Sequence, residues 1–521
     1  MRFFSTDHKV IGLQYAFTSL AFLLLGFLLI LLVRWQLAFP NTAVPVVGGL
    51  LGEANASGGA ILPEFYNQLG AMHGTIMVFL AVVPLAVGAF GNYLVPIMLG
   101  APDMAFPRMN MLSYWLYLAA GLTMAASFFL PGGAAGAGWT SYPPLSNFAT
   151  SGQTAWLIGM SLLAGSSLVG SINMIVTILQ LRAPGVTLMR LPFFLWSQLI
   201  TSFLLLLAFP PLQAAAILQL MDRVAGSSFF LPTGLVVSGS QIAATGGGSP
   251  LLWQHLFWFL AHPEVYVLIL PAFGIVAEVI AYATRKPLWG YRGMVGASVF
   301  MAFMSFLVWA HHMFLTGMGP TMSAFFQVTT MIISIPSVVL VSSLLLSLYG
   351  GSIRFTVPAV FALAFLPMFG IGGLTGLPLG LAATDIPLHD TYYVIGHFHY
   401  VVAPGTLFAI FAGIYYWFPT VTGRRMNDTL GYLHFWGSLI GMNGVFLPMF
   451  IQGLAGINRR LFDGGRTYTT GAALAPLYAW QWWFVVLLGF AQLFFIVNLF
   501  WSIRRGTRGV VEHVAPSAVR S

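Results

Sequence analysis

The chain has 521 residues, of which 58% are hydrophobic and only 6% are charged. A soluble globular domain carries about 25% charged residues, so this composition excludes a soluble enzyme and indicates a protein of the lipid bilayer. Cysteine is absent, which excludes disulfides, thioether-linked haem and thiolate metal sites, and the net charge of +8 comes without a basic arm for nucleic acid.

Apolar runs of about 20 residues recur along the whole chain, and each is long enough to cross a hydrocarbon core of about 30 Å. We expect an all-α fold, a polytopic membrane bundle that forms one domain over residues 1–521 with short tails. The sequence predicts about twelve transmembrane helices, at residues 12–35, 69–98, 112–131, 153–182, 192–221, 252–283, 293–318, 324–350, 356–378, 391–419, 431–455 and 478–503.

The basic residues predict the orientation of this bundle. An even number of spans places both termini on one side, and lysine and arginine gather on the cytoplasmic side of membrane proteins. The side of the termini carries Lys9, Arg108, Arg182, Arg190, Arg285, Lys286, Arg292, Arg354, Arg424, Arg425, Arg504, Arg505 and Arg508. The other side carries only Arg34, Arg223, Arg459, Arg460 and Arg466. We therefore expect both termini in the cytoplasm, and the protein in a bacterial cytoplasmic (inner) membrane.

Two spans carry histidines that could share one metal ion. In the sixth span His262 and Tyr266 lie four residues apart and share a helix face. In the seventh span His311 and His312 are adjacent and would point about 100° apart on a helix. Ionisable groups inside spans are costly and indicate function, and an all-nitrogen site suits copper or zinc. The alternative is a set of core histidines without metal.

The tenth span carries His397 and His399, which project from nearly opposite faces of one helix because they lie two residues apart. One helix could thus hold two cofactors. His73 in the second span could join His399 as the second axial ligand of one iron, leaving His397 as the sole ligand of another. Either histidine taken alone could be structural.

The chain contains, in this order, the motifs HGTIMVF, GNYLVPIMLGAPDMAFPRMN, GWTSYPPLS, HLFWFLAHPEVY, VWAHHMF and HDTYYVIGHFHY. Together they resemble subunit I of the haem-copper oxygen reductases, and most closely the cytochrome c oxidases, and the resemblance covers about residues 5 to 503. The resemblance implies a respiratory enzyme that reduces O2 to water, takes up protons and pumps them. It makes His73 and His399 the ligands of a low-spin haem and His397 that of a high-spin haem, with haem A expected and haem O left open.

The resemblance also makes His262, His311 and His312 the ligands of the copper ion CuB, with Tyr266 covalently joined to the first of them. On the outer face it assigns His389 and Asp390 to a magnesium ion that is completed by another subunit, although a helix cap is the alternative. Arg459 and Arg460 match the pair that binds haem propionates. Other haem-side positions are matched by Trp139, Asp385 and, near a formyl group, Arg34.

A proton route from the cytoplasm is also implied by the resemblance. It begins at Asp103, the only carboxylate between the second and third spans, and ends at Glu264. A carboxyl amid apolar groups can hold and pass a proton. The intervening positions are matched by Tyr15, Asn92, Asn110, Ser113, Ser166 and Ser167.

The second proton route of the family is not intact in this chain. Leu340 stands where the family has a lysine in the eighth span, and the only lysines are Lys9 and Lys286. Glu278 matches a position beside that route, so we hypothesise that it replaces the lysine as the protonatable inlet. The alternative is an interfacial carboxylate without that role.

The electron donor is predicted from positions that distinguish the branches of the family. Quinol-oxidising members carry an aspartate and a histidine where this chain has Ala38 and Phe65, although Gln68 matches them. We therefore expect cytochrome c as donor, a subunit II that carries the copper site for incoming electrons, and a subunit III. A nitric oxide reductase is disfavoured by Tyr266 and Asp103 but kept open by Leu340, and a transporter without cofactors would not explain the histidines.

Overall fold

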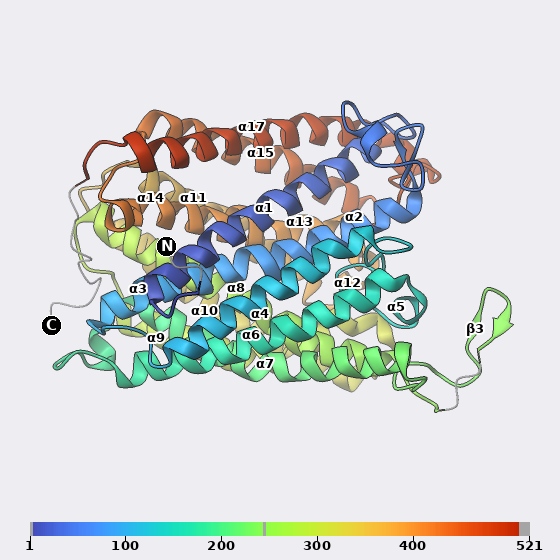
Figure 1. The fold of residues 1–521 in the computed structure, drawn as a ribbon, viewed down its shortest axis with the longest axis horizontal. Coiled ribbons are helices and arrows are strands. Elements are labelled where there is room, and N and C mark those ends of the chain that lie inside the picture. The colour runs from blue at the N-terminus through green and yellow to red at the C-terminus, as the bar shows by residue number, and fades with distance from the viewer. Residues whose placement is uncertain (1–3, 243–245, 510–521) are drawn as a thin grey trace.

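The computed structural model describes residues 4–242 and 246–509, and these form a bundle of long helices (Figure 1). Residues 1–3 and 510–521 of the expected tails lie outside the described residues. Within the described part, 12 helical stretches are long and apolar enough to span a membrane. This confirms the predicted number and order of spans, although most helices extend a few residues beyond the predicted ends.

Nine of the twelve spans each contain one long α-helix. Their bounds are α1 (His8–Ala38), α4 (Pro107–Ala126), α6 (Ser151–Gln180), α7 (Phe193–Val224), α8 (Pro250–Thr284), α10 (Gly319–Leu348), α11 (Val357–Leu379), α15 (Asp428–Leu454) and α17 (Pro476–Arg505). Three spans are composite: α2 (Pro63–Thr75), η2 (Ile76–Val82), η3 (Pro84–Ala89) and α3 (Phe90–Leu99); α9 (Tyr291–Ser305) and η6 (Trp309–Thr316); α13 (Tyr392–Tyr400), η7 (Val401–Leu407) and α14 (Phe408–Thr422).

Short elements connect the spans. They are η1 (Gly48–Leu50), β1 (Ala56–Ser57), β2 (Ala60–Ile61), η4 (Ser127–Phe129), α5 (Leu145–Phe148), η5 (Leu188–Arg190), β3 (Val236–Val237), β4 (Ser240–Gln241), α12 (Ala382–Leu388) and α16 (Thr469–Ala473). Each strand pair is an antiparallel hairpin, with Ala56 opposite Ile61 and Val236 opposite Gln241. The second hairpin projects away from the bundle (Figure 1).

The central helix of the bundle is α8. In its most apolar window 83% of the residues are buried, compared with 28% for α1 at the periphery. Helices α7 and α8 pack along their lengths, as do α15 with α17 and α4 with α6. The start of α1 and the end of α17 lie at one end of the bundle, and α5, α12 and β3 lie at the other (Figure 1). The first helix therefore begins, and the last helix ends, on the same side of the bundle.

Three segments next to the predicted ligands depart from α-helical geometry. The segments η2, η3 and η7 are π-helical, and Pro84 and Pro404 lie within the last two. Proline lacks the amide hydrogen that an α-helix needs, which favours a locally wider turn. The expectation of one regular helix around His311 and His312 is wrong, because α9 ends at Ser305 and both histidines lie on the 3-10 helix η6.

Candidate active site

One cavity of about 1320 Å³ lies inside the bundle. Ordinary small-molecule pockets measure about 300–1,000 Å³, so this space can hold more than one large planar group. All of the predicted cofactor-binding and metal-binding residues line it, together with Tyr266 and Glu264, from segments far apart in the sequence. They are Arg34, His73, Trp139, His262, Glu264, Tyr266, His311, His312, Asp385, His389, Asp390, His397, His399, Arg459 and Arg460.

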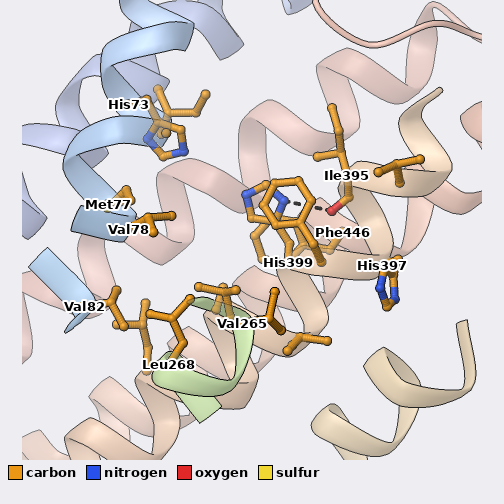
Figure 2. Close-up of a pocket in the computed structure, with 18 of the residues that line it drawn as sticks. His73, Met77, Val78, Val82, Val265, Leu268, Ile395, His397, His399 and Phe446 are labelled. Atoms are coloured by element: carbon orange, nitrogen blue, oxygen red, sulfur yellow. Dashed lines mark hydrogen bonds between the residues drawn. The ribbon is translucent and has the colours of Figure 1, made fainter. Parts of the chain in front are cut away.

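His73 on α2 and His399 on α13 face each other across this cavity (Figure 2). The Nδ1 atom of His73 lies 2.8 Å from the Gly26 carbonyl oxygen of α1, and that of His399 lies 2.8 Å from the Ile395 carbonyl oxygen. A ring nitrogen that donates to a carbonyl leaves the other nitrogen free as a metal ligand. The pair therefore fits the two axial positions of one haem.

His397 lies on the other side of α13 from His399 (Figure 2), as the spacing of two residues predicts. Its Nδ1 atom is 2.9 Å from the Gly372 carbonyl oxygen and 3.4 Å from the Thr375 hydroxyl of α11. Gly376 makes room for this imidazole, because a Cβ atom there would lie 2.7 Å from Cε1 of His397. His397 is thus oriented with Nε2 available, which fits a haem that has one protein ligand.

Three further imidazoles converge from α8 and η6. His262 Nδ1 and His311 Nε2 each lie 3.1 Å from His312 Nε2, and the ligand atoms of all three lie within 4.8 Å of one another. Metal–imidazole bonds of about 2.0 Å place ligand nitrogens about 3.3 Å apart, so the cluster fits a single metal ion. Two of these histidines also have a hydrogen-bond partner for the ring nitrogen that points away from the cluster. The Tyr266 hydroxyl lies 3.0 Å from His262 Nε2, and the Thr330 hydroxyl lies 3.0 Å from His311 Nδ1.

Trp258 supports this cluster and was not anticipated from the sequence. Its ring stacks on His312 with a centroid separation of 3.7 Å and an interplanar angle of 10°. Its Nε1 donates to the Tyr142 hydroxyl over 2.5 Å, and burial raises the pKa of Tyr142, which keeps that phenol neutral. A signal existed, because Trp258 precedes His262 by four residues and so shares its helix face.

The outer rim of the cavity carries the predicted magnesium and propionate residues. His389 Nδ1 donates to the buried Asp385 over 3.1 Å, and its Nε2 lies 4.0 Å from Asp390 Oδ2. Asp390 also accepts from Arg459 Nε over 2.7 Å and forms an ion pair with its NH2 group. The two residues predicted to bind magnesium thus lie next to each other at the rim, and Arg459, one of the two arginines predicted to bind propionates, is already paired with Asp390.

Charge at the rim is set by burial and by these contacts. Burial opposes ionisation of Asp390, but Arg459, His389 and Arg460 together hold its pKa below the usual value. Burial, followed by repulsion from Arg459, lowers the pKa of Arg460 to about 10. Arg460 therefore remains a cation at neutral pH and faces the cavity, as a partner for carboxylates requires.

Arg34, predicted to lie near a haem formyl group, and Gln68, which matches quinol-oxidising members, both form hydrogen bonds within the protein. Arg34 is buried on α1 and donates to Gln481 Oε1 over 3.3 Å, while it also lines the cavity. Gln68 donates to the Gly132 carbonyl oxygen over 2.9 Å and accepts from the Ala134 amide over 3.1 Å. Both hydrogen bonds of the Gln68 side chain hold the loop at residues 132–134 in place. Gln68 therefore has a structural role that does not require a bound quinol.

Apart from Glu264, the residues of the predicted proton route lie outside the cavity lining, on α1, α3, α4, α6 and the α3–α4 connection. The Tyr15 hydroxyl is 3.1 Å from Ser113 Oγ, and Ser166 donates to the Ser113 carbonyl oxygen over 2.6 Å. Asn92 and Asn110 are buried, and each has one amide atom without a partner among the described residues. Asp103 lies half-buried in the α3–α4 connection and Ser167 half-buried on α6.

Glu264 ends this series on α8. It is buried, and neither carboxyl oxygen has a hydrogen-bond partner within the described part of the chain. Buried polar atoms without protein partners are commonly served by water, so the gap between Ser166 and Glu264 suits a water chain.

Glu278 does not line the cavity, although it is buried on α8. One carboxyl oxygen lies 3.3 Å from the amide nitrogen of Phe194, at the start of α7, where it interacts with the helix N-terminus. Leu340 is buried and also stays outside the cavity lining. Instead, the α10 hydroxyls of Thr330, Ser334 and Ser337 line the cavity.

Comparisons with known proteins agree with this geometry. Residues 10–509 match the family described as Cytochrome C and Quinol oxidase polypeptide I. The chain is 45% identical over 511 residues to alternative cytochrome c oxidase subunit 1 of Bradyrhizobium diazoefficiens, covering 96% of this chain and 83% of the relative. It is 43% identical to cytochrome c oxidase subunit 1 of Synechocystis, with 97% and 85% covered.

Another relative is named for quinol, and not cytochrome c, as the electron donor. The chain is 38% identical to quinol oxidase subunit 1 of Bacillus subtilis, with 97% of this chain and 73% of the relative covered. The fold matches a solved heme-copper terminal oxidase dimer with a TM-score of 0.78 at 21% identity, over 98% of this chain and 86% of that one. The chain therefore belongs to the subunit I family of the haem-copper oxidases, which are membrane-bound oxidoreductases of respiratory electron transport.

Proposed function

We propose that this chain is the catalytic subunit of a terminal oxidase that reduces O2 to water with electrons from cytochrome c. The observation that carries the proposal is the arrangement of six histidines around one cavity. Five of them have a ring nitrogen held by a carbonyl, a hydroxyl or the Tyr266 phenol, and the other ring nitrogen is left for a metal. When bound, two haems and one copper ion supply electrons and the open coordination site at which O2 is held.

The protein's own residues orient these groups and move protons. His73 and His399 would hold the low-spin haem, His397 the high-spin haem, and the three-histidine cluster the copper. Tyr266 lies beside His262, where its phenol can give up a hydrogen atom during the reaction. Asp103 and Glu264 would deliver protons through the polar series between them, for chemistry and for pumping.

Haem A is the cofactor that this cavity favours. The cavity lining extends to a groove between α1 and α17, where Phe17, Leu24, Leu28, Leu493 and Phe500 line it and are all exposed. A long hydrocarbon tail could lie in such an apolar groove, which suits haem A or O. Arg34 also presents its guanidinium to the cavity, and a formyl group is a hydrogen-bond acceptor that only haem A has of the two.

Cytochrome c is the proposed donor, acting through a subunit II that carries a copper site, with a subunit III in the complex. Gln68, the one position that matches quinol-oxidising members, is already engaged with its own loop. His389 and Asp390 would hold a magnesium ion completed by subunit II. We place the protein in a bacterial inner membrane with both termini in the cytoplasm.

Glu278 as a replacement for the missing lysine stays a prediction. Its contact with the start of α7 and its absence from the cavity lining give it an alternative role in helix packing. Substituting Glu278→Gln should slow reduction of the high-spin haem if the carboxyl carries protons. Unchanged kinetics in that variant, together with slower kinetics in Ser337→Ala, would assign the route to the α10 hydroxyls.

The test of the proposed function is O2 consumption by the purified complex with reduced cytochrome c, alongside the spectrum of the reduced protein. We expect turnover to water and a haem A band. Turnover with quinol only, or nitric oxide consumption without O2 turnover, would move the chain to another branch of the family. A colourless protein would contradict the proposal entirely.

An Asp103→Asn variant should slow proton uptake while its spectrum stays unchanged.

A further inference from the structure

Two segments far apart in the sequence bring five arginines together at the end of the bundle where α17 ends. One segment is the connection between α14 and α15, and the other follows α17. The members of this arginine cluster are Arg424, Arg425, Arg504, Arg505 and Arg508. None of them belongs to the cofactor sites or to the proton routes described above. Like charges repel one another, so five cations on one surface are unfavourable unless an anion offsets them.

Backbone hydrogen bonds hold the two segments side by side. The Arg425 amide donates to the Thr507 carbonyl oxygen over 2.8 Å, and Arg424 lies opposite Arg508 in an antiparallel bridge. The Arg424 guanidinium also donates to the Gly506 carbonyl oxygen over 2.9 Å. The arginines therefore share one surface because the fold pairs their backbones, and the repulsion between them is built into the structure.

The charge of the cluster is not balanced within the described part of the chain. The described residues of the two segments carry one carboxylate, Asp428 in the first turn of α15, and it forms no ion pair with the cluster. The ion pair between arginine and aspartate found among the described residues is that of Arg459 with Asp390, which lies at the cavity rim. Four members of the cluster are exposed, namely Arg425, Arg504, Arg505 and Arg508.

Other basic residues predicted on the same side of the membrane contact the protein itself. Arg182 donates to the Ile178 carbonyl oxygen over 2.9 Å at the end of α6, and Lys286 donates to the Tyr349 carbonyl oxygen at the end of α10. These side chains satisfy the last carbonyl groups of helices. Within the cluster only Arg424 donates such a bond to another described residue, so the remaining guanidinium groups are available to an external anion.

The cluster adjoins an apolar stripe on the outward face of α17. Phe494, Val497 and Trp501 follow one another at helical spacing and are 37%, 55% and 53% exposed. Arg505 continues the stripe, and its guanidinium lies 5.2 Å from the centre of the Trp501 ring. Tryptophan and arginine at the end of an apolar helix mark the level of the lipid headgroups. An anion that meets both the cluster and the stripe must carry an apolar part next to its charge.

We propose that the arginine cluster binds the headgroup of an anionic phospholipid, in the leaflet on the side where α17 ends. The phosphodiester would accept hydrogen bonds from guanidinium groups of both segments, while an acyl chain lies along Val497 and Trp501. The bound lipid would thereby hold the end of α17 against the α14–α15 connection. A lipid with two phosphodiesters, cardiolipin, brings two negative charges on one molecule and should bind more tightly than phosphatidylglycerol. This binding does not depend on the reaction that the protein catalyses.

The experiment counts bound lipid by native mass spectrometry on the purified complex, titrated in detergent with cardiolipin, phosphatidylglycerol or phosphatidylcholine. We expect one cardiolipin molecule that is retained by the unmodified complex and lost when Arg504→Gln is combined with Arg508→Gln. Each basic residue near an anionic headgroup raises the affinity roughly fivefold, so this double variant should bind cardiolipin about 25-fold more weakly. Both side chains are exposed, so assembly and the absorption spectrum should be unchanged.

The matched control is Arg190→Gln combined with Arg292→Gln, which also removes two exposed arginines. These two residues lie near the starts of α7 and α9, which are well apart from α17 in Figure 1, so cardiolipin binding should be unchanged. Equal losses in the two double variants would overturn the proposal, as would equal retention of phosphatidylcholine. Displacement of the lipid by millimolar inorganic phosphate would overturn it too, because the site would then take a soluble anion. If the first double variant does not assemble, Arg508→Gln alone should lose affinity roughly fivefold.

Discussion

The two histidine-rich regions of the cavity are built from opposite distortions of the α-helix. His73 and His399 are followed by the wide π-helical segments η2 and η7, and the two imidazoles stand on opposite walls. His311 and His312 lie on the tight 3-10 helix η6, and their Nε2 atoms approach to 3.1 Å. A 3-10 helix turns adjacent residues about 120° apart, further than an α-helix does, so the rings of His311 and His312 meet through their side-chain orientations and not through the tight turn itself.

The largest effect is expected from His399→Ala, which removes one axial ligand of the proposed low-spin haem. The wall opposite His73 would then offer no replacement ligand. We expect the low-spin absorption band to disappear and turnover to fall by at least about 100-fold. A retained low-spin band in this variant would contradict the assignment of the facing pair.

His312→Ala should be as inactive as His399→Ala, but its absorption spectrum should differ from that of His399→Ala. It removes the imidazole that lies 3.1 Å from both of the others, so copper binding should fail. Metal analysis should then show loss of copper, while the low-spin band stays as in the unmodified protein. Equal loss of both signals would mean that the two regions are not independent.

Gly376→Ala tests the space beside His397. An added Cβ atom would lie 2.7 Å from the imidazole, so the ring must shift. Weaker ligation should lower carbon monoxide binding by roughly tenfold, with the low-spin band intact. Gly370→Ala on the same helix is the control, because no atom lies within 4 Å of a Cβ there. Identical behaviour of both variants would remove the steric explanation.

Thr330→Val should give the smallest effect of the four. It removes the hydroxyl that orients His311 but leaves every proposed ligand, so copper affinity should fall by about tenfold at most. Thr329→Val is the matched control, because its hydroxyl bonds only to carbonyls of its own helix. Copper titration of both variants measures the difference, and equal affinities would exclude an orienting role.

Much of this arrangement could be predicted from the sequence, because it depends on spacing along single helices. The number of spans follows from apolar length, and the opposite faces of His397 and His399 follow from a separation of two residues. One cavity brings the distant histidines together, and the roles that the resemblance assigns to them stay predictions.

Other features could not be predicted, because they depend on contacts between distant segments. The 3-10 geometry at His311, the engagement of Gln68 with residues 132–134 and the contact of Glu278 with α7 all involve partners that local periodicity does not specify. Trp258 was missed although its spacing from His262 was visible, because a tryptophan in an apolar span is ordinarily interpreted as core packing.

The placement of His397 and His399 on one short helix has a mechanical consequence. An α-helix with its side chains is about 10–12 Å across, so two groups bound on its opposite sides have a separation fixed by the helix itself. Electron tunnelling depends steeply on distance, and relative motion of the surrounding helices would leave this gap unchanged. With the two proposed haems bound, α13 would act as a rigid spacer, and thermal expansion of the bundle should affect proton delivery before it affects electron transfer between them.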